Sequence, residues 1–389
     1  MNDAIARITA WQRRSLLVGL AGVLLSIVGF LLDRDQFLRS YLFAYLYWMG
    51  MTLGCLGILL LHHTVGGKWG GVIRRFCEAG ARTLPLMAVL IIPILLAMTT
   101  LYIWARPEAA QDANIRTKAA YLNVPFFVAR TIFYFGVWIL YSRLLTKWSI
   151  EQDRTGDRRL IGRMRAVSAP GLVVFVMTAT FAFVDWIMSL EPHWYSTIYG
   201  AMFLVGQVLE AFALVIALLV VLAKFPPFEE HVTPQHLHDL GNLMFAFTVL
   251  WAYLSFSQYL IIWAGNLPDE IPWYLRRLSQ GWSAVAVFLI VFHFCVPFLL
   301  LLQRDVKRSP NLLFGVCLCM LVVRLVDVYW VVEPAFYEQR LQLHWTDFVT
   351  PFAVGGLWLA AFFRQLRAHP LLPVNDPSVE GAPRETVAF

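Results

Sequence analysis

Charged residues are scarce in this chain of 389 residues. They make up 14% of the sequence, whereas hydrophobic residues make up 59%. A soluble domain of this length could not cover its surface with so few polar side chains. The composition therefore excludes an ordinary soluble globular protein and indicates a membrane protein.

Motifs that hold redox cofactors are also missing. The five cysteines show no CxxC pair, no CxxCH motif for covalent haem and no four-cysteine cluster. Only His293 lies deep in an apolar stretch, whereas a buried b-type haem would need two facing histidines at one depth. Glycine-rich phosphate loops and nucleophile elbows are absent too. We therefore predict that this chain binds no haem, no iron–sulfur cluster and no metal ion.

Ten apolar stretches are each long enough to cross a bilayer, which takes about 20 helical residues. They cover residues 15–32, 39–62, 82–105, 121–142, 170–190, 198–223, 240–264, 280–302, 311–333 and 346–363. No small-residue cleavage site follows the first stretch, so we expect a retained helix there rather than a removable signal. The sequence predicts an all-α, polytopic membrane protein with ten transmembrane helices.

Lysines and arginines are distributed unequally between the two sides of this arrangement. The side that holds both termini carries 21 of them, and the opposite side carries 8. By the positive-inside rule, both termini face the cytoplasm. The net charge of +6 then reflects topology and attraction to anionic lipids, so it gives no reason to expect nucleic acid as a partner.

One twelve-residue pattern occurs twice, at the ends of the fifth and ninth apolar stretches. The first signature runs from Val184 to Tyr195, and the second runs from Val326 to Tyr337, with five of the twelve positions identical. Each has an aspartate within the apolar stretch, then Glu-Pro, then an aromatic pair. A carboxylate at membrane depth is costly, so the repeat indicates a functional site. The alternative is a duplicated helix end that is kept for packing.

The repeat divides the chain into two units that point the same way across the membrane. We predict an N-terminal segment with a flanking helix in residues 1–38, four-helix bundles in 39–197 and 198–337, and a second flanking helix in 338–369. Four prolines lie among polar residues in 370–389. We expect this tail to lack stable structure unless a neighbour holds it.

Six ionisable residues lie inside the apolar stretches: Arg130, Asp185, Glu210, His293, Arg324 and Asp327. Arg324 and Asp327 share a helix face, so we expect them to pair. Asp185 has no basic neighbour on its own helix, and Arg130 on the preceding antiparallel helix is its predicted partner. Glu210 has no cation close in sequence, which favours proton exchange near neutral pH.

These groups, with others at the helix ends, predict a path for protons across the membrane. Carboxylates and imidazoles can pass a proton through intervening water. The predicted path comprises Asp239 near the cytoplasmic side, Glu210 and His293 near the middle, and Arg130, Asp185, Arg324, Asp327 and Glu333 in the outer part. The alternative is a set of solvated or purely structural polar groups.

The first signature also has the side chains that a quinol site needs. Trp186, Trp194 and Tyr195 could hold a flat ring. Asp185 or Glu191, with His193, could accept hydrogen bonds and protons from the two quinol hydroxyls. Aromatic residues that only anchor the helix at the membrane interface are the alternative.

Two long blocks of the sequence resemble a known family. They are FVDWIMSLEPHWYSTIYG at residues 183–200, and residues 239–275, which contain DLGNLMFAF and WAYLSFSQYLIIWAGNLPDEIPWYL. Both resemble strongly the second polysulfide-reductase-like membrane subunit of alternative complex III, a quinol:cytochrome c oxidoreductase. The likeness extends over nearly all ten apolar stretches.

The resemblance implies a subunit of a bacterial inner-membrane complex, with two four-helix bundles and a flanking helix on each side. The implied partners are a sister polysulfide-reductase-like membrane subunit, a periplasmic iron–sulfur subunit, haem c subunits, small membrane subunits, a terminal oxidase in some complexes, and lipids. Menaquinol or ubiquinol would be oxidised near the outer face, with electrons passing through the partners' clusters and haems. The isolated chain is not expected to catalyse a reaction.

The family's polar positions, carried onto this sequence, assign Asp185, Glu191 and His193 to quinol and the remaining buried charges to protons. The resemblance leaves open whether this subunit or its sister binds quinol. Two other functions remain: an independent secondary transporter with a polar site between repeat halves, and a scaffold that only holds electron carriers at the membrane.

Overall fold

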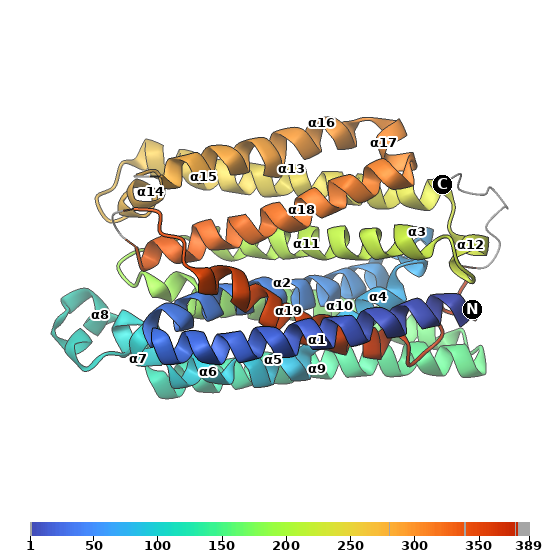
Figure 1. Cartoon of the computed structure of the whole chain (residues 1–389), viewed down its shortest axis with the longest axis horizontal. Helices are drawn as coiled ribbons and strands as arrows, with labels where there is room; N and C mark the ends of the chain where they lie inside the picture. Colours follow the sequence, from blue (N-terminus) through green and yellow to red (C-terminus); the bar gives the residue numbers. More distant parts are fainter. Residues whose placement is uncertain (1, 280, 338–339, 378, 380–389) are drawn as a thin grey trace.

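The computed structural model describes residues 2–279, 281–337, 340–377 and 379. Within these residues, ten helices are long and apolar enough to span a membrane, and they run along the longest axis of the molecule (Figure 1). The described residues form no strand. The prediction of an all-α, polytopic membrane protein with ten spans is confirmed.

The spans are built from α1 (Asn2–Leu32), α2 (Arg34–Val65), α4 to α6 (Arg74–Ala81, Leu84–Leu90, Ile92–Leu96), α9 (Val124–Thr155), α10 (Arg159–Trp186), α11 (Tyr199–Leu222), α13 (Pro234–Gly265), α15 and α16 (Trp282–Leu289, Val296–Leu302), α18 (Pro310–Val332) and α19 (Trp345–Leu366). The short helices between them are α3 (Lys68–Gly71), α7 (Met98–Leu101), α8 (Ala113–Thr117), α12 (Phe228–His231), α14 (Pro272–Arg277) and α17 (Arg304–Arg308).

Two spans differ from the expected straight helices. The third begins at Arg74, eight residues earlier than predicted, and is divided where Pro85 and Pro93 start new helical segments. The eighth contains a six-residue π-helix, Ile290–Cys295, which ends just before Pro297. Proline has no N–H group to donate to the preceding helical turn. The helical hydrogen-bond ladder is therefore interrupted at these prolines, and the spans divide there.

Local sequence fixes several helix ends. The Asn123 side chain accepts a hydrogen bond from the third residue of α9, and Thr233 does the same at the start of α13. The two helices end at residues in the left-handed region, Gly156 after α9 and Asn266 after α13. Glycine and asparagine tolerate that conformation better than other residues.

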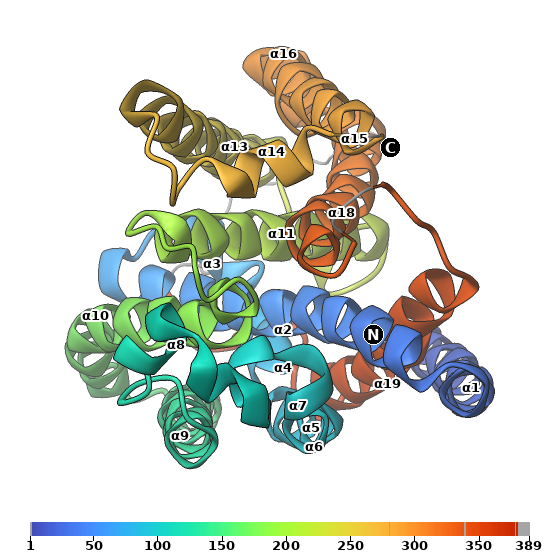
Figure 2. The same cartoon turned by 90° about the vertical axis from the view of Figure 1, so that its left-hand side faces the viewer.

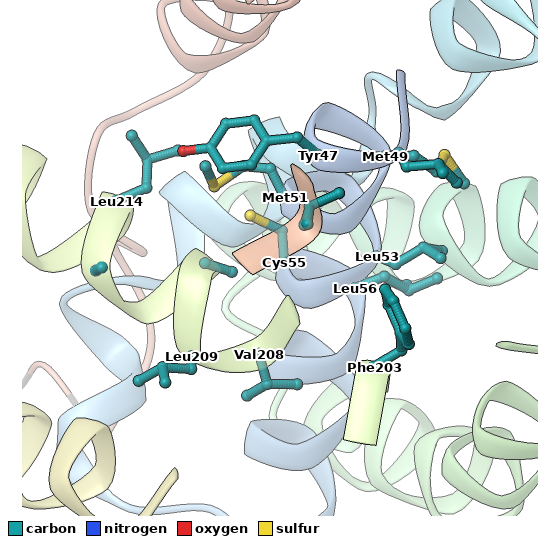
Figure 3. Close-up of a cluster of buried hydrophobic side chains, with 14 of the residues drawn as sticks. Tyr47, Met49, Met51, Leu53, Cys55, Leu56, Phe203, Val208, Leu209 and Leu214 are labelled. Atoms are coloured by element: carbon teal, nitrogen blue, oxygen red, sulfur yellow. The ribbon is translucent and has the colours of Figure 1, made fainter. Parts of the chain in front are cut away.

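Helices α2 and α11, the first of each predicted unit, pack against each other at the centre of the molecule. They are the most deeply buried spans among the described residues, and Figure 3 shows a cluster of buried apolar side chains to which both helices contribute. Helix α2 also packs on α4 and α10, while α11 packs on α13 and α18. The two predicted bundles therefore meet along their first helices.

The flanking helices α1 and α19 lie at opposite ends of the sequence but side by side in space (Figure 2). They approach closely because Gly19 and Gly22 of α1 face Gly356 and Ala353 of α19, and a Cβ atom at either of the α1 glycines would meet the α19 backbone. The two flanking helices, one at each end of the chain as expected, therefore pair with each other in space.

The first part of the predicted tail is held by neighbouring helices. Leu371 and Leu372 are buried, and Asp376 pairs with buried Arg74 of α4. The Val374 amide donates to the Asp153 carboxylate at 3.1 Å. Residues 370–377 thus dock on the end of the first bundle because their apolar and acidic side chains find partners there. Residues 378 and 380–389 of the predicted tail lie outside the described residues.

Replacing Gly54 with alanine is expected to loosen the contact between α2 and α11. A Cβ at Gly54 would collide with the backbone carbonyl of Gln207, which no side-chain rotation can relieve. Overpacking of this kind costs about 1–3 kcal/mol. Thermal unfolding in detergent should show a lower midpoint for Gly54→Ala. Gly136→Ala on α9, where the added Cβ meets open space, is the matched control, and an equal midpoint in both variants would contradict the packing account.

Candidate functional site

The first signature is locked by an ion pair. Both oxygens of Asp185 accept hydrogen bonds from the Arg130 guanidinium at 2.8 Å, and Tyr134 donates a third bond at 2.8 Å. The guanidinium also lies over the rings of Tyr121 and Phe126. The predicted partnership of Arg130 with Asp185 is confirmed. Asp185 is thus fully buried and accepts three hydrogen bonds from the protein.

The other residues assigned to quinol at the first signature do not gather around a ligand site. Trp186 is buried in an aromatic cluster, and Glu191 binds two arginines. His193 and Tyr195 are more than half exposed, with His193 beside Asp112. None of these residues lines the large cavity of the molecule. Packing and salt bridges occupy Asp185, Trp186 and Glu191, and quinol binding by Asp185, Trp186, Glu191, His193 and Tyr195 stays a prediction.

The second signature opens onto a cavity of about 810 Å³. Arg324 and Asp327 form the predicted ion pair on one face of α18, and both line this cavity. Its walls come from α11, α13, α14, the π-helical span and α18. The lining residues are Met202, Phe203, Val249, Trp251, Ala252, Tyr253, Ser255, Phe256, Tyr259, Trp273, Tyr274, Leu278, Ala286, Leu289, Ile290, Phe294, Cys295, Arg324, Asp327, Trp330 and Val331.

The chemistry of this cavity is aromatic and apolar around a single ion pair. Asp327 also interacts with the side chain of Trp251. Burial raises the pKa of the Tyr274 hydroxyl above its usual value, so Tyr274 is a neutral hydrogen-bonding group at the signature end of the cavity. Gln258 donates to that hydroxyl at 3.5 Å. The arrangement fits a flat, largely apolar molecule with a polar group beside Asp327.

His293 lies behind the cavity wall. Its ring stacks on Trp251 with the two centroids 3.7 Å apart, and neither ring nitrogen has a hydrogen-bond partner in the described residues. His293 belongs to the π-helix of the eighth span. Such distortions often occur at functional sites. Trp251 therefore separates this buried imidazole from the Arg324–Asp327 pair.

Glu210 lies where the two bundles meet. It is a fully buried residue of α11 that faces Gly50 of α2. Neither of its carboxyl oxygens has a hydrogen-bond partner in the described residues. Arg324 packs against Gly206, one helical turn before Glu210 on the same helix. Sequence alone showed no cation near Glu210, but the fold brings Arg324 into electrostatic range.

The remaining residues of the predicted proton path are far less connected. Glu333 is buried without a hydrogen-bond partner among the described residues and lies in the field of Asp347 and Arg39. Asp239 is at the opposite end of the molecule, where it accepts a hydrogen bond from Gln235 at 2.7 Å. No hydrogen bond between described residues joins Asp239 or Glu333 to the central group, so a continuous path remains a prediction.

Several residues that shape the cavity were missed by sequence reasoning. Trp251 separates His293 from the ion pair, Trp273 forms part of the wall, and Arg276 and Arg277 bind Glu191. The adjacent arginines in the short connection after α13 were a usable signal, because the side of the membrane predicted for them carries few basic residues.

Chemically, the cavity can bind an amphiphilic ring and offer one carboxylate as a proton acceptor beside a permanent cation. The chain matches no model of a known protein family, and no curated protein matches its sequence.

Proposed function

We propose that this chain is the second polysulfide-reductase-like membrane subunit of an alternative complex III and that its cavity binds quinol. The observation that carries the proposal is the 810 Å³ aromatic cavity with Arg324 and Asp327 in its wall. The proposed quinol site thus belongs to the second signature rather than the first. The partners named by the resemblance, including the iron–sulfur and haem c subunits, belong to the same proposal.

The cavity is accessible from the side that faces lipid. Tyr253 and Phe256 of α13 and Ile290 of the eighth span line it, and all three are about 60% exposed. A quinol with a hydrocarbon tail is dissolved in the bilayer, so it can enter sideways and leave its tail outside. An independent transporter or a scaffold would not need an aromatic cavity that opens toward lipid.

In the proposed reaction, a quinol hydroxyl donates a hydrogen bond to Asp327. Oxidation of one quinol releases two electrons and two protons. Asp327 accepts the two protons in turn, passing the first into the predicted proton path before it takes the second, while both electrons go to the iron–sulfur subunit of the complex, which serves as oxidant. Arg324 holds the carboxylate in place and stabilises its charged form before the transfer.

A photoreactive azidoquinone tests this assignment in the purified complex. We expect cross-links on peptides around Trp251–Tyr259 and Arg324–Val331, because these segments line the cavity. Ala252→Trp, which fills the cavity, should abolish labelling. Val173→Trp on the lipid-exposed face of α10 is the matched control and should leave labelling unchanged. Labelling between Trp186 and Tyr195, or none in this subunit, would overturn the proposal.

A further inference from the structure

Helix α14 lies across the signature end of the cavity, between the ends of α13 and α15 (Figure 2). Trp273 and Tyr274 of this helix, with Leu278 just after it, contribute to the cavity wall. It packs on α15. The helix therefore stands between the cavity and the space beyond that end of the membrane-spanning helices.

The first signature holds α14 in place. Glu191 accepts hydrogen bonds from Arg276 at 3.0 Å and from Arg277 at 2.8 Å. Trp194 stacks on Trp273 with the two centroids 5.0 Å apart, and its indole N–H donates to the Glu270 carbonyl at 3.1 Å. These contacts come from the unit that does not contain the cavity.

The second signature contacts α14 from the other side. Arg277 donates to the Val331 carbonyl at 2.6 Å, and its guanidinium lies 3.8 Å from the centroid of the Trp273 ring. The Trp330 indole donates to the Arg277 carbonyl at 3.3 Å. Arg277 is thus buried between both signatures. Glu191 supplies the acidic partner of this buried cation, and a lost partner at such a position is costly.

The segment that carries α14 begins and ends at residues with positive φ. Asn266 has a φ of 48° and Gly281 has a φ of 95°. Both positions permit a change of chain direction next to the long helices α13 and α15. Side-chain contacts to the signatures, rather than a continuous helix, therefore determine where α14 lies.

We infer that α14 is a cap on the cavity and that Glu191 is the positioning residue that latches it. The cap closes the signature end against water, so a ligand exchanges through the lipid-facing side. Exclusion of water strengthens the interaction between Arg324 and Asp327 and keeps released protons from leaking into the solvent. Only the identity of the ligand rests on the proposed function. The cap itself follows from the contacts of Glu191, Arg276 and Arg277.

Cys295 reports on access to the cavity, because this free cysteine is half-buried in its wall. The other partly exposed cysteine is Cys319, so a Cys319→Ser background isolates the signal from Cys295. The purified complex in lipid vesicles is treated with a charged methanethiosulfonate, which cannot enter lipid, or with N-ethylmaleimide, which can. In the native protein, we expect N-ethylmaleimide to label Cys295 and the charged reagent to react slowly.

Glu191→Gln should raise the rate with the charged reagent by about tenfold, because charge-assisted hydrogen bonds to both arginines are weakened. The rate with N-ethylmaleimide should stay the same. Asp269→Asn, at an exposed carboxylate in the same segment, is the matched control and should change neither rate. Arg276→Gln, at the more exposed arginine, gives a milder form of the same result if Glu191→Gln assembles poorly.

The cap would be refuted by an unchanged rate with the charged reagent in both Glu191→Gln and Arg276→Gln. It would also be refuted if the rates of Cys295 labelling with both reagents rose equally, since that result indicates general loosening of the protein. Azidoquinone labelling distinguishes refutation of the cap from failure of the proposed function. A native protein that shows the reagent selectivity but no quinone label would retain the cap and lose the quinol assignment.

Discussion

Under the proposed function, Asp327→Asn is expected to lower quinol turnover by the assembled complex by a factor of about 10²–10⁴, the usual contribution of a positioned proton acceptor. Asparagine keeps the shape of the side chain but cannot take the proton. The cavity, in contrast, should still admit quinol, so kcat should fall far more than KM rises. Steady-state oxidation of decylubiquinol, normalised to haem content, measures this effect.

The matched comparison is Asp185, the residue at the same position of the first signature. Asp185 is enclosed by Arg130 and Tyr134 and does not line the cavity. Complexes that assemble with Asp185→Asn should therefore retain most of their turnover. Equal losses in the two variants, or full turnover in Asp327→Asn, would contradict the assignment of the reaction to the second signature.

Asp185→Asn is expected to act on stability rather than on turnover, whereas Asp327→Asn, which also breaks a buried ion pair, should act on both. The substitution leaves the mostly buried Arg130 without a charged partner, and breaking a buried ion pair in this way costs about 3–5 kcal/mol. The thermal unfolding midpoint of the purified complex should fall clearly, and the yield of assembled complex should fall with it.

A double-mutant cycle provides the control for this second prediction. Arg130→Gln combined with Asp185→Asn removes both charges, so the pair should be less destabilised than the sum of the single variants. Additive losses would mean that Arg130 and Asp185 do not stabilise the fold through each other. That result would contradict the claim that the Arg130–Asp185 ion pair stabilises the first signature.

Sequence reasoning succeeded where a pattern has one physical reading. Long apolar stretches predict spans because backbone polar groups in lipid must be satisfied within a helix. The pairing of Arg324 with Asp327 followed from helical spacing, and that of Arg130 with Asp185 followed from two antiparallel neighbours at similar depth. In each case, a buried charge had one nearby partner.

The location of the cavity could not be predicted in this way. The two signatures are similar in sequence, but Arg130 on a neighbouring helix closes the first, whereas Arg324 on the same helix leaves space beside the second. The role of Glu191 depends on Arg276 and Arg277 of α14, which lie 85 and 86 residues further along the chain. Such long-range contacts decide that Glu191 pairs with the arginines of α14 and that Asp327 lines the cavity.

A density map of the assembled complex with bound quinone tests the central claim most directly. The account predicts a flat ring in the cavity between α13 and α18, with an oxygen within hydrogen-bonding distance of Asp327 and the tail leaving toward lipid. A ring among Trp186, His193 and Tyr195, or a cavity filled by a lipid chain while quinone binds elsewhere, would contradict it.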